Sequence, residues 1–152
     1  MPADITPYAD AAYADTYHDT FIGRDDWCNQ TEANKLKYLK TATRAIERLN
    51  FAGEKASSSQ ELQFPRGSDT SVPDDIQQAC CELAWSLFDG VDPEFEMENL
   101  RSKTQGVGSA RATYSPDVFA DYIVAGIPSQ RAWHLLVPYL RDPDELGISR
   151  VS

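Results

Sequence analysis

Two long amphipathic stretches constrain the fold of this chain more than any other feature of its sequence. Between Thr31 and Asn50, apolar side chains recur at three- and four-residue intervals, and most of the cations fall on other faces. A second stretch follows Pro73 and repeats small or apolar residues at the same spacing, Ile76, Ala79, Cys80, Leu83, Ala84 and Leu87. A helix with one apolar face must bury that face against another element, so both stretches predict a helical bundle.

Both helices carry boundary signals. Thr31 is a suitable N-cap for the first helix, and residues 50–53 end it with an Asn and a Gly. In the second, a proline and two acidic residues at 73–75 suit the first turn, where carboxylates complement the positive end of the helix dipole. An Asp-Gly pair at 89–90 marks its end. The sequence therefore predicts helices over about residues 31–50 and 73–88.

The region before the first long helix predicts a shorter helix and a turn. Thr6 is expected to cap the short helix and Pro7 to occupy its first turn, with helical spacing continuing to about Tyr17. Residues 21–29 contain a glycine and several charges, which are typical of a turn, and Trp27 is expected to anchor that turn.

The rest of the chain predicts loops and shorter elements. Residues 60–66 alternate apolar and polar positions and predict a short extended segment, whereas residues 91–115 predict a long loop with one weak strand over 107–114. A short helix is expected over 115–124. A last helix opens at 128–129, is broken by a proline, and faces inward with four residues, Trp133, Leu136, Val137 and Leu140.

Together these elements predict a mainly α fold, a small bundle of about four helices with long loops and a minor β segment. Residues 1–141 are expected to form one domain, because 152 residues suit a single hydrophobic core. Residues 142–152 lack periodicity and predict a C-terminal tail. We expect no secretion signal and no membrane span, since the start of the chain is not basic and no long apolar run occurs.

Charge is strongly uneven along the chain. The formal net charge is −10, and by segment it is −5 over 1–30, +3 over 31–66, −9 over 67–100 and +1 over 101–152. Such acidity argues against a protein that holds nucleic acid through bulk positive charge. The acidic block at 67–100 is expected to be either a solvated face or a surface that repels polyanions or meets a basic partner.

Motifs for catalysis or metal binding are sparse, and we do not expect this protein to be an enzyme. The three cysteines, Cys28, Cys80 and Cys81, are read as reduced thiols, with the adjacent pair packing inside its helix. No zinc, nucleotide-binding or hydrolase motif occurs, so we expect no catalytic residue, no metal and no cofactor. A nucleophile pair of Cys28 with His18 is the one catalytic alternative left open.

Arg66 has an unusual position among the basic residues. It ends the extended segment at 60–66 and directly precedes Gly67. We expect it either to contact a partner or to form a local salt bridge, and the sequence leaves both alternatives open.

The order of landmarks along the chain resembles that of a known group of proteins. The landmarks are an Ala-Asp-x-x-Tyr pattern near the start, Trp27 before a Lys-rich helix, a Phe-x-Gly at 51–53, Gln-x-Leu-x-Phe-Pro-Arg at 60–66, and Val-Pro-x-x-Ile at 72–76. They are similar to those of the small head-tail connector (adaptor or head-completion) proteins of tailed bacteriophages. The similarity covers about residues 3–89, and more loosely 106–114 and 128–140. Related sequences are often labelled DnaT-like single-stranded DNA-binding proteins.

The resemblance implies a structural role without catalysis. Such proteins form a ring, expected here to be dodecameric, beneath the portal protein and above a tail, tail-terminator or nozzle protein, and double-stranded DNA passes through it without specific binding. The implied location is the virion neck, reached from the host cytoplasm during assembly. The residues expected at a portal or subunit interface are Arg66, Arg141, Asp142, Leu146, Ile148 and Arg150.

The charge pattern agrees with this expectation. A pore through which DNA slides should not grip phosphates, and carboxylates lining it repel the DNA backbone. In a ring, the +3 segment 31–66 of one copy can meet the −9 segment 67–100 of the next. We also expect the loops at 53–71 and 91–114 to gain structure on oligomerisation, because long polar loops are costly to order alone.

Single-stranded DNA binding of the DnaT-like kind is the alternative function. In that hypothesis, aromatic side chains provide stacking platforms for bases and nearby lysines contact the phosphates. The aromatic candidates are Trp27, Tyr38 and Phe51, and the lysines are Lys35, Lys37 and Lys40.

Overall fold

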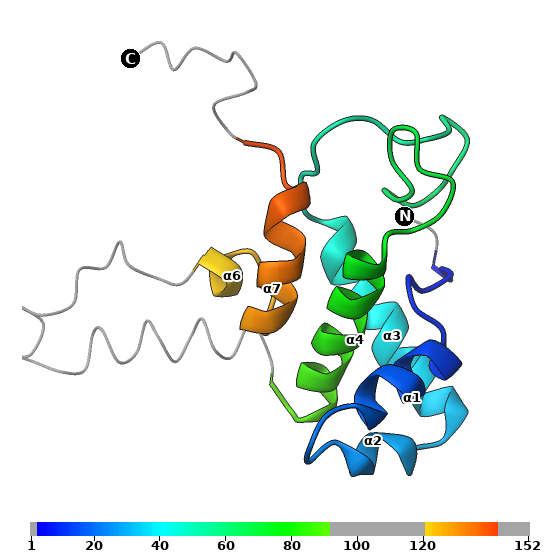
Figure 1. Ribbon diagram of the computed structural model, residues 1–152, viewed down its shortest axis with the longest axis vertical. Coiled ribbons are helices and arrows are strands. Elements are labelled where there is room, and N and C mark those ends of the chain that lie inside the picture. Colours follow the sequence, from blue (N-terminus) through cyan, green and yellow to red (C-terminus); the bar gives the residue numbers. More distant parts are fainter. Residues whose placement is uncertain (1–2, 92–120, 143–152) are drawn as a thin grey trace, which may run out of the picture.

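A computed structural model describes residues 3–91 and 121–142 of the chain (Figure 1). These residues form helices α1 (Ala11–Asp19), α2 (Asp25–Cys28), α3 (Glu32–Glu47), α4 (Asp74–Phe88), α6 (Asp121–Val124) and α7 (Gln130–Leu136), and the 3₁₀ helix η2 (Val137–Tyr139). The described part contains no strand, only isolated bridges between Phe51 and Leu140 and between Lys55 and Arg66. The predicted mainly α fold is confirmed, and the weak strand expected at 107–114 lies outside the described residues.

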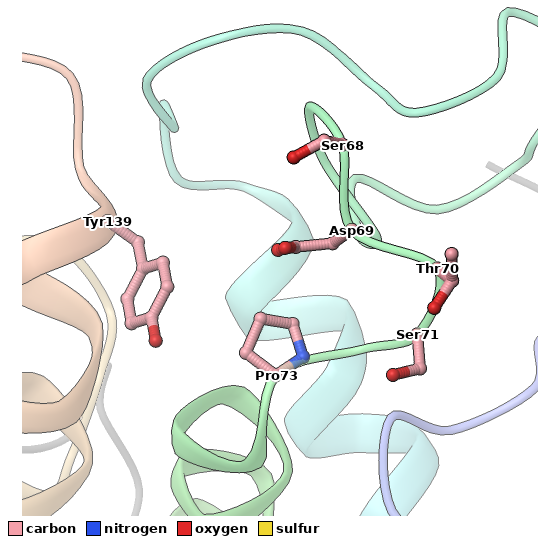
Figure 2. Close-up of a pocket in the computed structure, with 6 residues that line it drawn as sticks. All are labelled: Ser68, Asp69, Thr70, Ser71, Pro73 and Tyr139. Atoms are coloured by element: carbon pink, nitrogen blue, oxygen red, sulfur yellow. The ribbon is translucent and has the colours of Figure 1, made fainter.

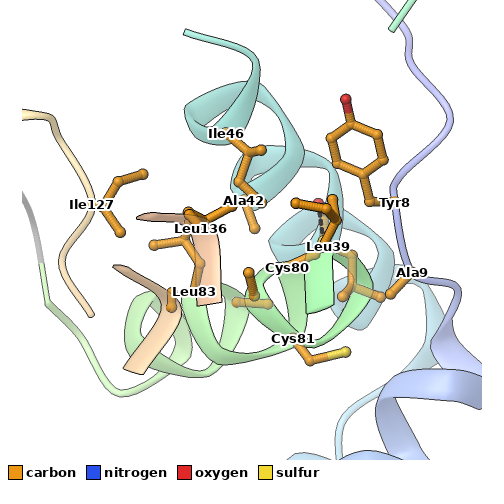
Figure 3. Packing of buried hydrophobic residues seen from close by; sticks show 14 of the residues in the cluster. Tyr8, Ala9, Leu39, Ala42, Ile46, Cys80, Cys81, Leu83, Ile127 and Leu136 are labelled. Atoms are coloured by element: carbon orange, nitrogen blue, oxygen red, sulfur yellow. Dashed lines mark hydrogen bonds between the residues drawn. The ribbon is translucent and has the colours of Figure 1, made fainter. Parts of the chain in front are cut away.

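Helix α4 is the centre of the bundle. It packs against α3 on one side and α7 on another, while α1 and α2 cover one end of the pair formed by α3 and α4 (Figure 1). Figure 3 shows Leu39 of α3 and Leu136 of α7 lying against Cys80 and Leu83 of α4, and all four side chains are fully buried. The apolar face predicted for the second stretch is therefore the surface on which α3 and α7 pack.

The two long helices begin where the sequence predicts. Thr31 Oγ1 accepts a hydrogen bond from the backbone N–H of Asn34 at 3.2 Å, which satisfies one of the free donors at the start of α3. Pro73 precedes α4, and Gly90, with φ of 91°, follows it in the left-handed conformation that glycine adopts without strain. Helix α3 ends a few residues earlier than predicted, with Arg48 as its C-cap.

The first helix differs from the prediction. Helix α1 begins at Ala11 rather than near Thr6, because Asp10 is the N-cap and its Oδ1 accepts from the N–H of Tyr13 at 2.7 Å. The preceding residues are not helical and bend at 8–9, and the N–H of Tyr8 donates to Thr43 Oγ1 of α3 at 3.0 Å. In this non-helical segment Tyr8 is buried in the core.

The loop between α3 and α4 is folded around one side chain. The Arg66 guanidinium donates to the carbonyl oxygens of Phe51, Ala52, Gly53 and Gln63. Phe64 inserts between Phe51 and Tyr8, with ring centroids at 4.7 and 5.9 Å. Contacts within the single chain therefore hold loop 53–71. This differs from the expectation that the loop gains structure on oligomerisation. Most of the 91–114 loop lies outside the described residues.

Replacing Arg66 with alanine should loosen this loop. The variant loses several charge-assisted hydrogen bonds at once, and because the side chain is half-buried we expect a stability loss of about 2 kcal/mol. Urea unfolding followed by circular dichroism measures that loss, and limited proteolysis should show faster cleavage within 53–66. Arg131→Ala, which removes an exposed arginine from α7, serves as the control. Unchanged proteolysis of Arg66→Ala would contradict the role given to this guanidinium.

The C-terminal helix follows the prediction except at its end. Ser129 caps α7, since its Oγ accepts from the N–H of Ala132 at 3.1 Å. Pro138 lies in η2, which confirms the expected break in the α-helix. Leu136 is buried as predicted, but Val137 is 43% exposed. The change to 3₁₀ geometry rotates the residues after Leu136 away from the α-helical register, which explains the difference.

Candidate functional site

Four cations form a row on the outward face of α3. Lys37, Lys40, Arg44 and Arg48 follow one another at steps of three or four residues, so they share one face and span about 16 Å. The opposite face is fully buried through Leu39, Ala42 and Ile46. The other exposed positions on the same face as the cations are uncharged, Ala33, Asn34 and Thr41. The half-buried Glu47 borders this face, and its carboxylate accepts hydrogen bonds from Tyr8 and Gln63. We call the four cations the basic row.

The N-terminal segment contacts the middle of the basic row. The Asp4 carboxylate lies 2.5 Å from Lys40 Nζ, and Arg44 Nη2 donates to the carbonyl oxygen of Ala3 at 2.7 Å. The hydrogen bond and charge of Lys40 hold the pKa of Asp4 below its ordinary value. Lys37 and Arg48 are exposed at the two ends of the row. The row therefore already binds an anionic group of its own chain.

Two of the three proposed stacking residues are inside the protein. Trp27 is 0% exposed and its Nε1–H donates to Asp15 Oδ1 at 3.0 Å, while Phe51 is 3% exposed. Tyr38 is half-buried and packs edge-on against Phe88 with ring centroids 5.7 Å apart. The hypothesis that Trp27 and Phe51 are stacking platforms is wrong, because core packing takes both rings away from solvent.

The lysines of that hypothesis divide into two groups. Lys35 is buried, and its Nζ lies 2.9 Å from Asp15 Oδ1 and 3.3 Å from the carbonyl oxygen of Cys28, so it joins α3 to α1 and α2. Lys37 and Lys40 belong to the basic row. The sequence-based set lacks the other two members, Arg44 and Arg48, although their helical spacing from Lys40 is readable in the sequence.

The residues predicted at an interface are partly brought together. Arg141 Nη2 donates to the carbonyl oxygen of Gly53 at 3.3 Å, and Arg66 donates to that same oxygen. Both arginines thus hold the loop after α3, and neither forms a salt bridge with an acidic residue in the described part of the chain. Asp142 is exposed. The remaining three, Leu146, Ile148 and Arg150, lie outside the described residues.

A polar network is buried where α1, α2 and α4 meet. Arg24 Nη2 lies 2.9 Å from Glu82 Oε2, with side chains only 7% and 3% exposed. Tyr17 donates its hydroxyl to the other Glu82 oxygen at 2.7 Å, and Arg24 Nη1 lies 3.2 Å from His18 Nδ1. Each charged group therefore has a partner, as burial requires. This network joins three helices and is structural.

His18 makes the stability of the fold depend on pH. Burial, followed by the nearby Arg24 charge, lowers the pKa of His18 to about 4 from an ordinary 6.5. Between pH 6.5 and 4 the unfolded chain binds more protons at this residue than the folded chain, so stability falls as pH drops through that window.

The contribution of His18 is measurable by comparison with His18→Phe, which keeps a ring beside Trp27 but cannot be protonated. Thermal melts at pH 7 and pH 5 should show a larger loss of Tm in the wild-type protein than in the variant. The carboxylates common to both proteins cancel in this difference. An equal loss of Tm in the two proteins would contradict the lowered pKa.

The catalytic alternative finds no support in the geometry. The buried His18 ring contacts Arg24 and the Trp27 ring, whose centroid is 4.7 Å away, whereas Cys28 is exposed. The packing role predicted for the other cysteines is confirmed, since Cys80 and Cys81 are fully buried, and burial raises the pKa of Cys80 to about 11. The described residues contain no group of three side chains suited to a metal ion.

Two shallow hollows open on the surface. One lies beside the start of α4 and is lined by hydroxyl and carboxylate groups together with Tyr139 (Figure 2). The Tyr139 hydroxyl donates to Asp75 Oδ2 at 2.9 Å. The other lies over the Arg24–Glu82 pair, with Trp85 and the fully exposed Ile22 at its edge. Neither brings a nucleophile and a base together.

Comparison with known proteins identifies the family. A protein family described as "Putative DnaT-like ssDNA binding protein" matches residues 2–140. The comparisons with curated proteins and with solved structures found no match. None of the helices described is long and apolar enough to span a membrane. The family match supports the DnaT-like alternative more directly than it supports a phage connector. Because the match covers nearly the whole chain, the protein belongs to this DnaT-like family.

Proposed function

We propose that this protein binds single-stranded DNA through the basic row of α3. The observation that carries the proposal is the composition of that face: four cations, two of them exposed at its ends, and among residues 37–48 a single acidic residue, Glu47, whose carboxylate accepts hydrogen bonds from Tyr8 and Gln63. Cations that track a nucleic-acid backbone neutralise phosphates and release counterions, which supplies most of the sequence-independent affinity. The DnaT-like family match supports the same class of ligand.

The acidity of the whole chain limits the strength of this binding. Charges farther from the row than the Debye length, about 8 Å at physiological ionic strength, are largely screened. The net charge of −10 therefore weakens the approach of DNA at low salt without abolishing local contacts. Because Trp27 and Phe51 are buried, base stacking contributes little, and phosphate contacts dominate. We expect weak binding with little sequence preference.

Fluorescence anisotropy of a labelled single-stranded oligonucleotide of mixed sequence tests the proposal. Binding is expected at micromolar protein in 50 mM salt. Its log affinity should fall linearly with log salt, by about 0.7 for each phosphate contacted. Absence of binding at tens of micromolar protein in 50 mM salt would overturn the proposal.

A second function, the structural head-to-tail adaptor of a tailed phage, is favoured by the landmark order and the separation of charge. The basic row lies on α3, whereas Asp69, Asp74 and Asp75 are exposed near the start of α4. Two such faces on one chain suit a head-to-tail contact between copies, which closes into a ring when the rotation allows. In this second proposal the partners are further copies, a portal protein and a tail protein in the virion neck, with double-stranded DNA in the channel.

Mass photometry of the protein alone and mixed with its portal separates this second function from the first. A ring, or a complex with the portal, supports the adaptor. Monomers that never associate with a portal ring count against it, whatever the outcome of the DNA titration.

A further inference from the structure

The N-terminal segment has a fixed part and a loosely held part. From Ile5 onward it is fixed, because Ile5 and Tyr8 are buried and the Tyr8 hydroxyl donates to a Glu47 carboxylate oxygen. Burial, together with that carboxylate, raises the pKa of Tyr8 far above its ordinary value, so the hydroxyl remains a donor. Ala3 and Asp4, which precede Ile5, are held instead by contacts at the protein surface.

Residues Ala3 and Asp4 are both exposed, and the contacts that they make outside their own segment are with the basic row. The Asp4 carboxylate pairs with Lys40, and the Ala3 carbonyl oxygen accepts from Arg44. These two oxygen acceptors, one of them anionic, lie at the centre of the row. A phosphate offers the same chemistry to a lysine and an arginine, namely anionic oxygens that accept charge-assisted hydrogen bonds.

Displacing these contacts requires little free energy. Exposed ion pairs contribute little to stability because both groups are well solvated when apart. The Asp4 side chain is largely exposed and its charge is screened by salt, whereas Ile5 is buried and stays in place. Ala3 and Asp4 can therefore move off the row while the rest of the segment remains packed.

We propose that residues 3–4 occupy the centre of the DNA-binding face in the free protein and are displaced by the strand that binds there. This proposal rests on the proposed function, and it assigns that site a built-in competitor. DNA then meets the exposed Lys37 and Arg48 first, and its phosphates replace the Asp4 carboxylate at Lys40. The segment thus lowers the affinity of the site for short strands.

The binding test compares Asp4→Asn with Asp26→Asn. Both variants remove one negative charge, but Asp26 lies on α2 and forms no salt bridge with the row in the described part of the chain. Asp4→Asn should bind a single-stranded 12-mer about two- to five-fold more tightly than the wild-type protein, equal to about 0.4–1 kcal/mol. Asp26→Asn should change the binding free energy by less than half as much. Equal affinities of Asp4→Asn and the wild-type protein would overturn the proposal.

A measurement without DNA keeps the two proposals separable. Labelling with an amine-reactive reagent, read by peptide mass spectrometry, reports the accessibility of Lys40 relative to Lys37 in the same molecule. Asp4→Asn should raise the relative labelling of Lys40, and Asp26→Asn should not. If labelling rises but neither protein binds DNA, the occupation of the row by Asp4 stands and the DNA-binding function falls. Unchanged Lys40 labelling would overturn the occupation itself.

Discussion

Replacing Arg24 with alanine should destabilise the protein by about 3–5 kcal/mol, more than the loss expected for Arg66→Ala. The substitution leaves Glu82 charged, 3% exposed and without its cation. The Tyr17 hydroxyl still donates to Glu82, but a neutral donor does not replace a guanidinium. Since small domains are stable by only about 5–15 kcal/mol, this loss removes a large share of the total stability and should lower the Tm clearly. Urea unfolding followed by circular dichroism gives the difference directly.

A double variant shows whether the cost comes from the unpaired charge. Arg24→Met with Glu82→Leu removes both ions and keeps apolar volume, and exchanges of this kind are often neutral or stabilising in buried sites. We expect the double variant to be more stable than Arg24→Ala, with the loss of the Tyr17 hydrogen bond as its main remaining cost. A loss below about 1 kcal/mol for Arg24→Ala would contradict the burial of this pair.

Reversing the charge at the two ends of the basic row should have the largest effect on DNA binding. Lys37→Glu with Arg48→Glu changes the charge of the exposed ends by four units and places carboxylates beside the phosphates. We expect affinity for single-stranded DNA at 50 mM salt to fall at least tenfold, which corresponds to about 1.4 kcal/mol. Lys37 is exposed on α3 and Arg48 is the exposed C-cap of that helix, so the helical circular dichroism spectrum should be unchanged.

The matched control carries the same charge change elsewhere. Lys55→Glu with Arg131→Glu alters two exposed cations in the loop after α3 and on α7. This control should lose only the modest affinity that a more negative overall charge removes. Equal losses in the two double variants would show that net charge, and not the basic row, governs binding.

The long helices were predictable because their signals are local. The Thr31 cap, the proline and acids at 73–75 and the apolar spacing all lie within the segments that they shape. The start of α1 was not predictable in the same way, because Thr6 and Asp10 are both good capping residues. The choice between them depends on contacts distant in sequence, because Tyr8 is buried in the core and its N–H donates to Thr43 of α3.

The candidate site was predictable only in part. Lys37 and Lys40 were identified from the lysine-rich helix, and the same spacing extends to Arg44 and Arg48. The burial of Trp27 depends on residues from α1, α3 and α4, among them Asp15 and Phe88, and no local pattern reveals it. The Arg24–Glu82 pair joins residues 58 positions apart, which one sequence alone does not connect.

The most direct test of the central claim is a map of backbone amide signals by nuclear magnetic resonance during a titration with a single-stranded oligonucleotide. The amides of residues 37–48, together with those of residues 3–5 that lie against them, should shift most, and the shifts should reverse in high salt. Shifts that centre on α7 and the hollow beside Trp85, or no shifts at saturating DNA, would contradict the claim that the basic row of α3 binds DNA.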